Sequence, residues 1–258
     1  MNKNTQKELL KIVKKNYDEI AEDFNTTRNR KNILESWTGL SDLVDEVKDG
    51  DKILDVGCGN GRLFDVFENK DVFYFCVDDN KKLLDFAEKR IKEKIKDDKK
   101  IECKECNILE LNKISEIDFD YIFCIAVLHH IPGKEKQIAS LKQIKNKISA
   151  DGKIIITVWN LWSQKKFRKI IFRTELLKIF NKFKKIFLFS KKKKNLFYPS
   201  LPVSGDFGDI LFEGFNKKSK RYYHAFRKRE LKKIVKKAGL KLNKIYKDDF
   251  NYYLVLSK

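Results

Sequence analysis

The sequence predicts an α/β fold with a doubly wound, seven-stranded and mostly parallel sheet that ends in an antiparallel hairpin. Short β-rich runs alternate with helical patterns between residues 52 and 159, which is typical of successive βαβ units. A loop with three glycines joins the first of these strands to the helix behind it. The last two predicted strands are separated only by Asp248 and Asp249, so we expect them to pair as a hairpin.

Two helices are expected within residues 1–50, the first from about Gln6 to Asp23 and the second ending near Lys48. Strands are predicted at 52–56, 72–77, 100–105, 119–125, 153–159, 240–247 and 250–256, and helices at 61–68, 81–96, 134–148 and 226–238. Residues 160–215 are interpreted as a basic insertion of aromatic helix and loop. No repeat and no Pro/Gly/Ser linker divides residues 1–258, which predicts a single domain.

The glycine loop has the pattern Asp55-x-Gly57-x-Gly59-x-Gly61 between a buried strand and a helix. A loop of this kind lets the backbone approach a ligand at the N-terminus of a helix. The G-x-G-x-x-G spacing of dinucleotide sites is not met, because the third glycine comes one residue early and is followed by Arg62. A nucleotide-like ligand other than NAD is therefore favoured.

An acidic residue follows the second strand, where folds of this kind bind ribose hydroxyls. Asp78 lies 19 residues after Gly59, close to the usual offset of ~20 residues. Asp79 is the alternative, but Asn80 reads as the N-cap of the next helix, and this favours Asp78.

Together these motifs resemble the class I S-adenosylmethionine-dependent methyltransferases. The resemblance implies S-adenosylmethionine as the cofactor, with the glycine loop under its ribose and methionine parts and Asp78 on the ribose hydroxyls. Asn107 stands where many family members have Asp beside the adenine, and its side-chain carbonyl can accept from the adenine amino group. Ala126, at the end of the fourth strand, is expected to border the cofactor.

Four further stretches resemble the tRNA wobble-uridine methyltransferases, which esterify a carboxymethyl group on uridine. They are Ile125–Ile131 with its two histidines, Tyr17–Ala21 followed by Thr26–Arg28, Val158–Asn160 followed by Gln164, and Arg221–Arg227 followed by Glu230-Leu231. The resemblance implies tRNA as the substrate and a small zinc-binding activator subunit as a possible partner. It also places candidate substrate contacts at Arg28, His129, Arg221 and His224.

Each of these candidates has a structural alternative. Arg28 could form an ion pair at a helix end, and His224 could pack beside two tyrosines. One of His129 and His130 is expected in the core, since successive residues at a strand end point to opposite sides, and His130 is predicted to be that one. The carboxylate of a carboxymethyl group is ionised at neutral pH, so positioning rather than a general base is required.

The net positive charge of the chain comes from its last 99 residues. Residues 1–159 hold 29 Lys+Arg and 30 Asp+Glu, whereas residues 160–258 hold 28 and 7, so the two parts carry −1 and +21. This segregation indicates a docking surface for a polyanion. Aromatic residues within it could stack on unpaired bases or form an amphipathic core, and residues 165–194 could instead lie on an acidic membrane. These aromatic residues are Trp162, Phe167, Phe172, Phe180, Phe183, Phe187, Phe189, Phe197 and Tyr198.

The remaining composition sets limits on location and metal content. No apolar run is long enough to span a bilayer, and no apolar segment follows the polar start, so a cytoplasmic protein is expected. The five cysteines are expected to be reduced thiols, and no metal site is predicted because the Cys103/Cys106 pair lacks a partner pair. Three functions stay open: a tRNA methyltransferase, a small-molecule methyltransferase acting on quinone or lipid precursors, and a non-catalytic relative that binds RNA or a partner.

Overall fold

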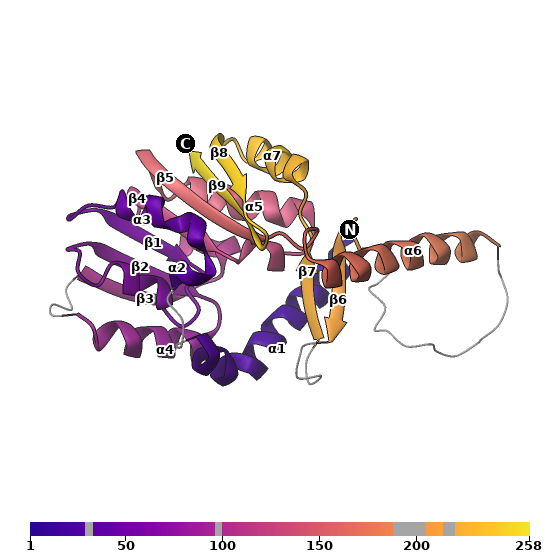
Figure 1. Cartoon of the computed structure of the whole chain (residues 1–258), viewed down its shortest axis with the longest axis horizontal. Helices are drawn as coiled ribbons and strands as arrows, with labels where there is room; N and C mark the ends of the chain where they lie inside the picture. The colour runs from indigo at the N-terminus through magenta and orange to yellow at the C-terminus, as the bar shows by residue number, and fades with distance from the viewer. Residues whose placement is uncertain (29–32, 96–99, 188–204, 214–219) are drawn as a thin grey trace.

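The computed structural model describes residues 1–28, 33–95, 100–187, 205–213 and 220–258, with side chains omitted for 181–187. Its main sheet has seven strands in the order β3-β2-β1-β4-β5-β9-β8 (Figure 1). The strands are β1 (Lys52–Val56), β2 (Phe73–Asp78), β3 (Ile101–Glu105), β4 (Phe119–Ile125), β5 (Ile148–Trp159), β8 (Lys241–Lys247) and β9 (Asn251–Ser257). The first five are parallel, and β9 pairs antiparallel with both β5 and β8. The seven-stranded fold with its closing hairpin is confirmed.

Alternate residues of the strands build two cores, one on each face of the sheet. On one face Leu54 and Val56 pack with α5 (Lys134–Lys145) and α7 (Lys228–Lys237). On the other face Ile53 joins a cluster that includes residues of α4 (Lys81–Lys92) and of the short N-terminal helices. Those helices are α2 (Ile33–Ser36), η1 (Thr38–Leu40) and α3 (Ser41–Asp45). A parallel sheet covered on both faces requires such apolar strands.

The strand order reverses between β1 and β4, which places a crevice at the carboxyl ends of these two neighbours. The glycine loop leaves β1 at this point. Gly57 has φ +74°, and a Cβ there would lie 2.4 Å from a side-chain carbon of Val127. Gly61 has φ +73° and packs against the backbone of Ala87 in α4. Side chains at these two positions would push the loop away from the crevice.

Several local features differ from the sequence-based expectation. The helix expected at 61–68 is the short 3₁₀ segment η2 (Arg62–Val66), which follows Gly61 in the αL conformation. A further 3₁₀ segment, η4 (Ile108–Lys113), follows β3, and η5 (Leu128–His130) follows β4. The largest difference is a second sheet of two strands, β6 (Asp209–Glu213) and β7 (Lys220–His224). Each of these strands has only five residues, which are too few to establish a period from sequence.

Helix α1 (Lys3–Arg28) is the element that covers the carboxyl edge of the sheet. It contacts both β7 of the small sheet and α4 beside the main sheet (Figure 1). Leu9 packs with Leu211 and Tyr222 of the small sheet, whereas Lys14 reaches the backbone carbonyl of Asp79 beyond β2. The helix therefore joins the small sheet to the main sheet across the crevice.

Helix α6 (Lys165–Phe187) leads away from the main sheet (Figure 1). Phe167 and Ile171 at its start are buried against the small sheet, and Phe172 and Phe180 are exposed. Residues 188–194 of the predicted basic segment 165–194 lie outside the described residues, as do the aromatic residues Phe197 and Tyr198; Phe189 belongs to the same undescribed part. Phe183 and Phe187 belong to the part of α6 whose side chains are not described. No helix in the described part of the chain is both long and apolar enough to cross a membrane.

Candidate active site

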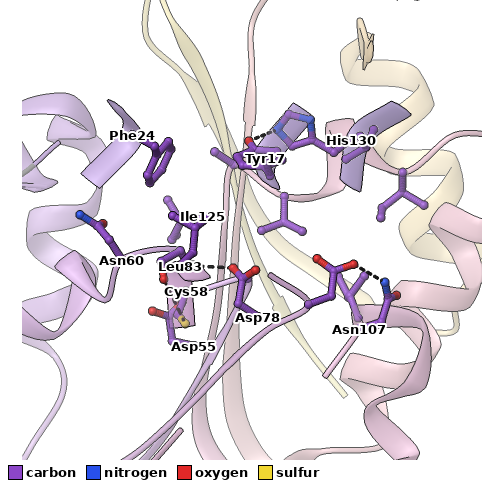
Figure 2. Close-up of a pocket in the computed structure, with 18 of the residues that line it drawn as sticks. Tyr17, Phe24, Asp55, Cys58, Asn60, Asp78, Leu83, Asn107, Ile125 and His130 are labelled. Carbon is purple, nitrogen blue, oxygen red and sulfur yellow. Dashed lines mark hydrogen bonds between the residues drawn. The ribbon is translucent and has the colours of Figure 1, made fainter. Parts of the chain in front are cut away.

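One cavity of about 410 Å³ opens at the carboxyl edge of the sheet, between α1 and the ends of β1, β2 and β4. This volume lies in the range of small-molecule sites. Figure 2 shows Asp78 on one side, with Tyr17 and His130 across the space from it and Phe24 near Asn60. The lining comes from the loops after the four parallel strands β1 to β4 and from the inner face of α1. The wall is therefore assembled from segments far apart in sequence.

Asp78 is held by two backbone donors. Its Oδ2 accepts from the N–H of Gly59 at 2.8 Å, and its Oδ1 accepts from the N–H of Asn80 at 2.9 Å. Burial raises the pKa of Asp78 to about 6, against the effect of these two donors, which lower it. Each carboxylate oxygen has a second lone pair, so the group can accept from a pair of ligand hydroxyls in a fixed orientation.

Asp55 lies deeper, at the base of the glycine loop. It accepts a hydrogen bond from the hydroxyl of Tyr74 at 2.7 Å, and burial raises its pKa to about 7. It is 2% exposed and also lines the cavity. Asp55 therefore contacts both the cavity and, through Tyr74, the buried core of the sheet.

Asn107 lies beside Asp79 at the carboxyl end of β3. Its Nδ2 donates to Oδ2 of Asp79 at 2.7 Å, and its Oδ1 accepts from the N–H of Leu109 at 2.9 Å (Figure 2). The amide is therefore oriented, with one lone pair of Oδ1 left for an additional donor. Ala126 faces the same cavity with φ +59°, and Thr157 accepts from its N–H through both Oγ1 and the backbone carbonyl. A left-handed alanine at this position is strained backbone held by its neighbours.

Tyr17 and His130 form a hydrogen-bonded pair at the far side of the cavity, with 2.9 Å between the hydroxyl and Nε2. Burial lowers the pKa of His130 to about 3, so the ring is neutral at physiological pH. The backbone of Tyr222 is its second partner, as expected for a carbonyl that accepts from Nδ1–H. This tautomer makes Nε2 the acceptor and the hydroxyl of Tyr17 the donor.

The two histidines are placed the other way round from the sequence-based expectation. His130 lines the cavity, whereas His129 is fully buried and is not part of the lining. His129 packs against Trp159 and Tyr223, with ring centroids 5.0 and 5.5 Å away, and burial holds its pKa well below the usual value. The reason is the 3₁₀ turn η5 (Leu128–His130), in which side chains do not alternate as they do along a strand.

Two arginines supply positive charge to the cavity wall. Arg28, the last residue of α1, lies over the ring of Phe24 at 5.8 Å. Arg62 follows the glycine loop, is 7% exposed and stacks on Trp37 at 4.4 Å. Burial and the charge of Arg28 lower the pKa of Arg62 to about 9. Its Nη1 has no hydrogen-bond partner among the described residues, so an anion bound here would satisfy it.

His224 and Arg221 lie outside the cavity lining. The ring of His224 is clamped on both sides, since Nδ1 lies 2.7 Å from Asp209 and Nε2 lies 3.0 Å from Glu230. Burial alone would lower its pKa, but the hydrogen bonds to the two carboxylates raise it to about 9. With both nitrogens used, His224 holds the small sheet together and has no donor left for a substrate. Arg221 instead faces Tyr223, whose raised pKa it moderates through a hydrogen bond and its charge.

The structure thus brings together most of the residues that sequence reasoning selected, and adds others. Asp55, Gly57, Gly59, Asp78, Asn107, Ala126 and Arg28 all line the cavity. Tyr17, Phe24, Arg62, His130 and Trp159 were not selected, although each lies in or beside a motif that was noted. The sequence carried no sign that α1 crosses the edge of the sheet, so Tyr17 and Phe24, which this helix contributes to the cavity, were not predicted. Within the described ranges, no group of three or more His, Cys, Asp or Glu is placed to hold a metal ion.

Comparison with known proteins supports this interpretation of the sequence. Residues 54–154 match the family described as a methyltransferase domain. A Schizosaccharomyces pombe protein named tRNA (carboxymethyluridine(34)-5-O)-methyltransferase is 26% identical over 242 residues, 94% of each chain. A Xenopus tropicalis protein of that name is 32% identical over 157 residues, 61% of this chain. The chain spans only 22% of the frog protein's length and 33% of an Arabidopsis thaliana relative's. The resemblance expected from the motifs is confirmed.

Solved structures agree on the fold. A SAM-dependent methyltransferase from Methanosarcina mazei superimposes with a TM-score of 0.64 at 16% identity, covering 84% of this chain and 97% of that one. A DhpI structure in complex with SAH superimposes with a TM-score of 0.63 at 11% identity, covering 96% of both chains. The chain therefore has the class I methyltransferase fold.

Proposed function

We propose that this chain transfers a methyl group from S-adenosylmethionine to the carboxylate of a carboxymethyl group on the wobble uridine of tRNA. The observation that carries the proposal is the continuity of the cavity, which reaches from Asp78 to Arg28 and the neutral Tyr17–His130 pair. The name and full-length coverage of the fission yeast relative support the choice of substrate. We also propose that the reaction takes place in the cytoplasm.

The cofactor end of the cavity is the glycine loop with Asp78, Asn107 and Ala126. Gly57 and Gly59 present bare backbone, and Asp78 is fixed to accept from ribose hydroxyls. Arg62 offers an unpaired, buried N–H to a carboxylate such as that of the methionine part. Bound S-adenosylmethionine supplies an electrophilic methyl group. The donors and acceptors present match each part of such a ligand.

The substrate end must orient a carboxylate without weakening it as a nucleophile. A carboxylate with a pKa near ~4 is already ionised at neutral pH, so the site needs no general base. Arg28 can hold one carboxylate oxygen while the other faces the methyl group, and the neutral Tyr17–His130 pair adds polarity without a second positive charge. A second cation close to the nucleophilic oxygen would stabilise the ground state and slow the transfer.

The test is to incubate the protein with S-adenosylmethionine and tRNA that contains carboxymethyluridine, and to analyse the nucleosides by mass spectrometry. The methyl ester of carboxymethyluridine is the expected product, and Asp78→Ala should abolish most of it whereas Asp85→Ala, which alters an exposed acid on α4, should not. Release of S-adenosylhomocysteine with lipid extract instead of tRNA would favour the small-molecule methyltransferase. No release with either would favour a non-catalytic relative.

RNA binding gives an independent test of the substrate class. The +21 excess in residues 160–258 should make tRNA affinity fall steeply with salt, with a log–log slope of about −0.7 to −0.9 for each neutralised phosphate. Salt-insensitive binding would contradict the proposal. The zinc-binding activator subunit that the resemblance implies has no support in the relatives compared, so the first assays use the chain alone.

A further inference from the structure

An exposed group of three aromatic rings and one arginine lies at the base of α6, and we call it the Trp162 stack. The ring of Trp162 is almost parallel to that of Phe207, at 9° and 6.0 Å between centroids, and Phe172 meets it edge-on at 6.0 Å. The guanidinium carbon of Arg227 lies 4.7 Å from the centroid of Trp162 and 4.1 Å from that of Phe207. The indole N–H of Trp162 donates to the carbonyl of Ala225 at 2.9 Å, which fixes the ring.

The stack is anchored to the wall of the cavity. Trp159 lines the cavity and packs on Tyr223 with 4.8 Å between ring centroids. Tyr223 belongs to the buried cluster of the small sheet, against which Trp162 also packs. One buried apolar cluster therefore connects Trp159 at the cavity wall with Trp162 of the exposed stack. A ligand that extends out of the cavity along this cluster would reach these rings.

A purely structural role does not explain the exposure of the outer rings. Phe172 is 58% exposed and Phe207 is 50% exposed, although a cation–π pair of this kind at the surface is worth only about 0.5–1 kcal/mol. Single exposed apolar side chains are common, but a group of adjacent ones beside cations marks an interaction site. Trp162 and Arg227 orient the rings, and Phe207 keeps half of its surface for a ligand.

The charge around the stack favours a polyanion. Arg227 precedes α7, whose exposed face carries six cations: Lys228, Arg229, Lys232, Lys233, Lys236 and Lys237. The acid of this helix, Glu230, is neutralised by His224 on the side that faces the core. Flat rings next to a basic helix match the chemistry of single-stranded nucleic acid, in which bases stack and phosphates pair with cations. An apolar peptide would gain nothing from these six charges.

We propose that the Trp162 stack binds one unpaired nucleobase of the RNA, next to the nucleotide that enters the cavity. This inference rests on the proposed function and extends it, because it assigns the contact that places the anticodon loop over the active site. The base stacks on the exposed face of Phe207, and α7 contacts the adjoining phosphates. Stacking of this kind tolerates any base, so it contributes affinity and register rather than sequence specificity.

The test measures binding of a synthetic anticodon stem-loop RNA by fluorescence anisotropy, together with a series in which one loop nucleotide at a time is made abasic. Phe207→Ala should weaken binding of the intact RNA by about tenfold, and Phe207→Trp should keep it within a factor of about three. One abasic RNA should bind wild type and Phe207→Ala equally, because the base that stacks on the ring is already missing. Phe73→Ala is the matched control, since Phe73 is an exposed ring under Lys100 at the opposite edge of the sheet.

The outcomes separate this inference from the proposed function. If wild type methylates tRNA but Phe207→Ala binds every RNA of the series as wild type does, the stacking contact is refuted and the methyltransferase proposal stands. If Phe207 is coupled to one loop base but no nucleoside is methylated, the stacking contact stands and the proposed reaction fails. Tighter binding to phosphatidylserine vesicles than to RNA, lost in Phe207→Ala, would overturn the inference by assigning the rings to lipid.

Discussion

The cavity edge and the small β6–β7 sheet meet at Tyr223, but their buried charges are arranged in opposite ways. In the small sheet, His224 is paired with Asp209 and Glu230, so its charge is satisfied within the protein. At the cavity edge, Arg62 is buried with an N–H that lacks a partner among the described residues. Paired buried charges hold a fold together, whereas unpaired ones indicate where a ligand completes the structure.

The largest effect is expected from breaking the paired region. His224→Ala removes the cation between Asp209 and Glu230 and should lower the free energy of unfolding by about 3–5 kcal/mol. Urea unfolding followed by circular dichroism measures this loss. His224→Gln, which keeps the size and one donor, provides a variant that folds more readily. If His224→Gln is as stable as wild type but loses methylation, the residue belongs to the active site and the comparison fails.

The contribution of His224 and its two carboxylate partners to the stability of the fold should depend on pH. An unfolded histidine has a pKa near ~6.5, and the folded value for His224 is about 9. The protonated ring therefore stabilises the fold fully below about pH 6.5, and this contribution, roughly 3 kcal/mol, is lost as the pH rises through 9. The difference in unfolding free energy between wild type and His224→Gln should shrink over this interval. A constant difference would show that the ring is not protonated in the folded protein.

The next largest effect separates the two histidines. Arg28→Ala and His130→Ala should each lower kcat/KM by about 10²-fold and leave the affinity for S-adenosylmethionine within a factor of a few. His129→Ala should mainly lower stability, because His129 is buried away from the cavity. Single-turnover methylation and calorimetry of all three variants measure these effects. Loss of turnover confined to His129→Ala would restore the assignment made from sequence.

A smaller effect is expected at the cofactor end. Asp78→Ala should weaken S-adenosylmethionine binding by about 1.5–3 kcal/mol, the cost of losing a charged acceptor for buried hydroxyls. Asp85→Ala is the control and should bind as wild type does. Unchanged calorimetric affinity in Asp78→Ala, or tighter binding of NAD than of S-adenosylmethionine by wild type, would contradict the cofactor assignment.

The smallest effect is expected for the pH dependence of S-adenosylmethionine affinity, which reports on the carboxylate of Asp78. The pKa of Asp78 in the free protein is about 6, and ligand hydroxyls favour its ionised form. Affinity for S-adenosylmethionine should therefore be constant above this pH and fall by up to about tenfold per pH unit below it. Asp78→Asn should remove the dependence. If the affinity of wild type does not change with pH, Asp78 is ionised over the whole range, and its two backbone donors offset the effect of burial on its pKa.

The sequence predicted correctly those features that depend on residues close together in the chain. The glycine loop follows β1, and Asp78 ends the neighbouring strand β2. Their separation along the chain therefore brings the N–H of Gly59 next to the carboxylate of Asp78. Several of the parallel strands are predicted from continuous apolar runs, as expected for strands buried on both faces. The antiparallel pair β8–β9 is predicted from its turn at Asp248 and Asp249. The β6–β7 sheet was missed because neither strand carries a strong pattern, and its existence depends on packing against α1 and α6.

By itself the sequence determined the fold class and predicted a glycine loop and an acid that both line the cavity, because these features depend on contacts between near neighbours in the chain. The tertiary structure alone decided which histidine faces the cavity, since a 3₁₀ turn replaces the strand-like alternation at residues 128–130. It also decided that His224 is paired with Asp209 away from the cavity and that Tyr17 and Arg62 line the cavity. These assignments depend on how α1 and the small sheet close over the main sheet, and such long-range packing leaves no periodic trace in the sequence.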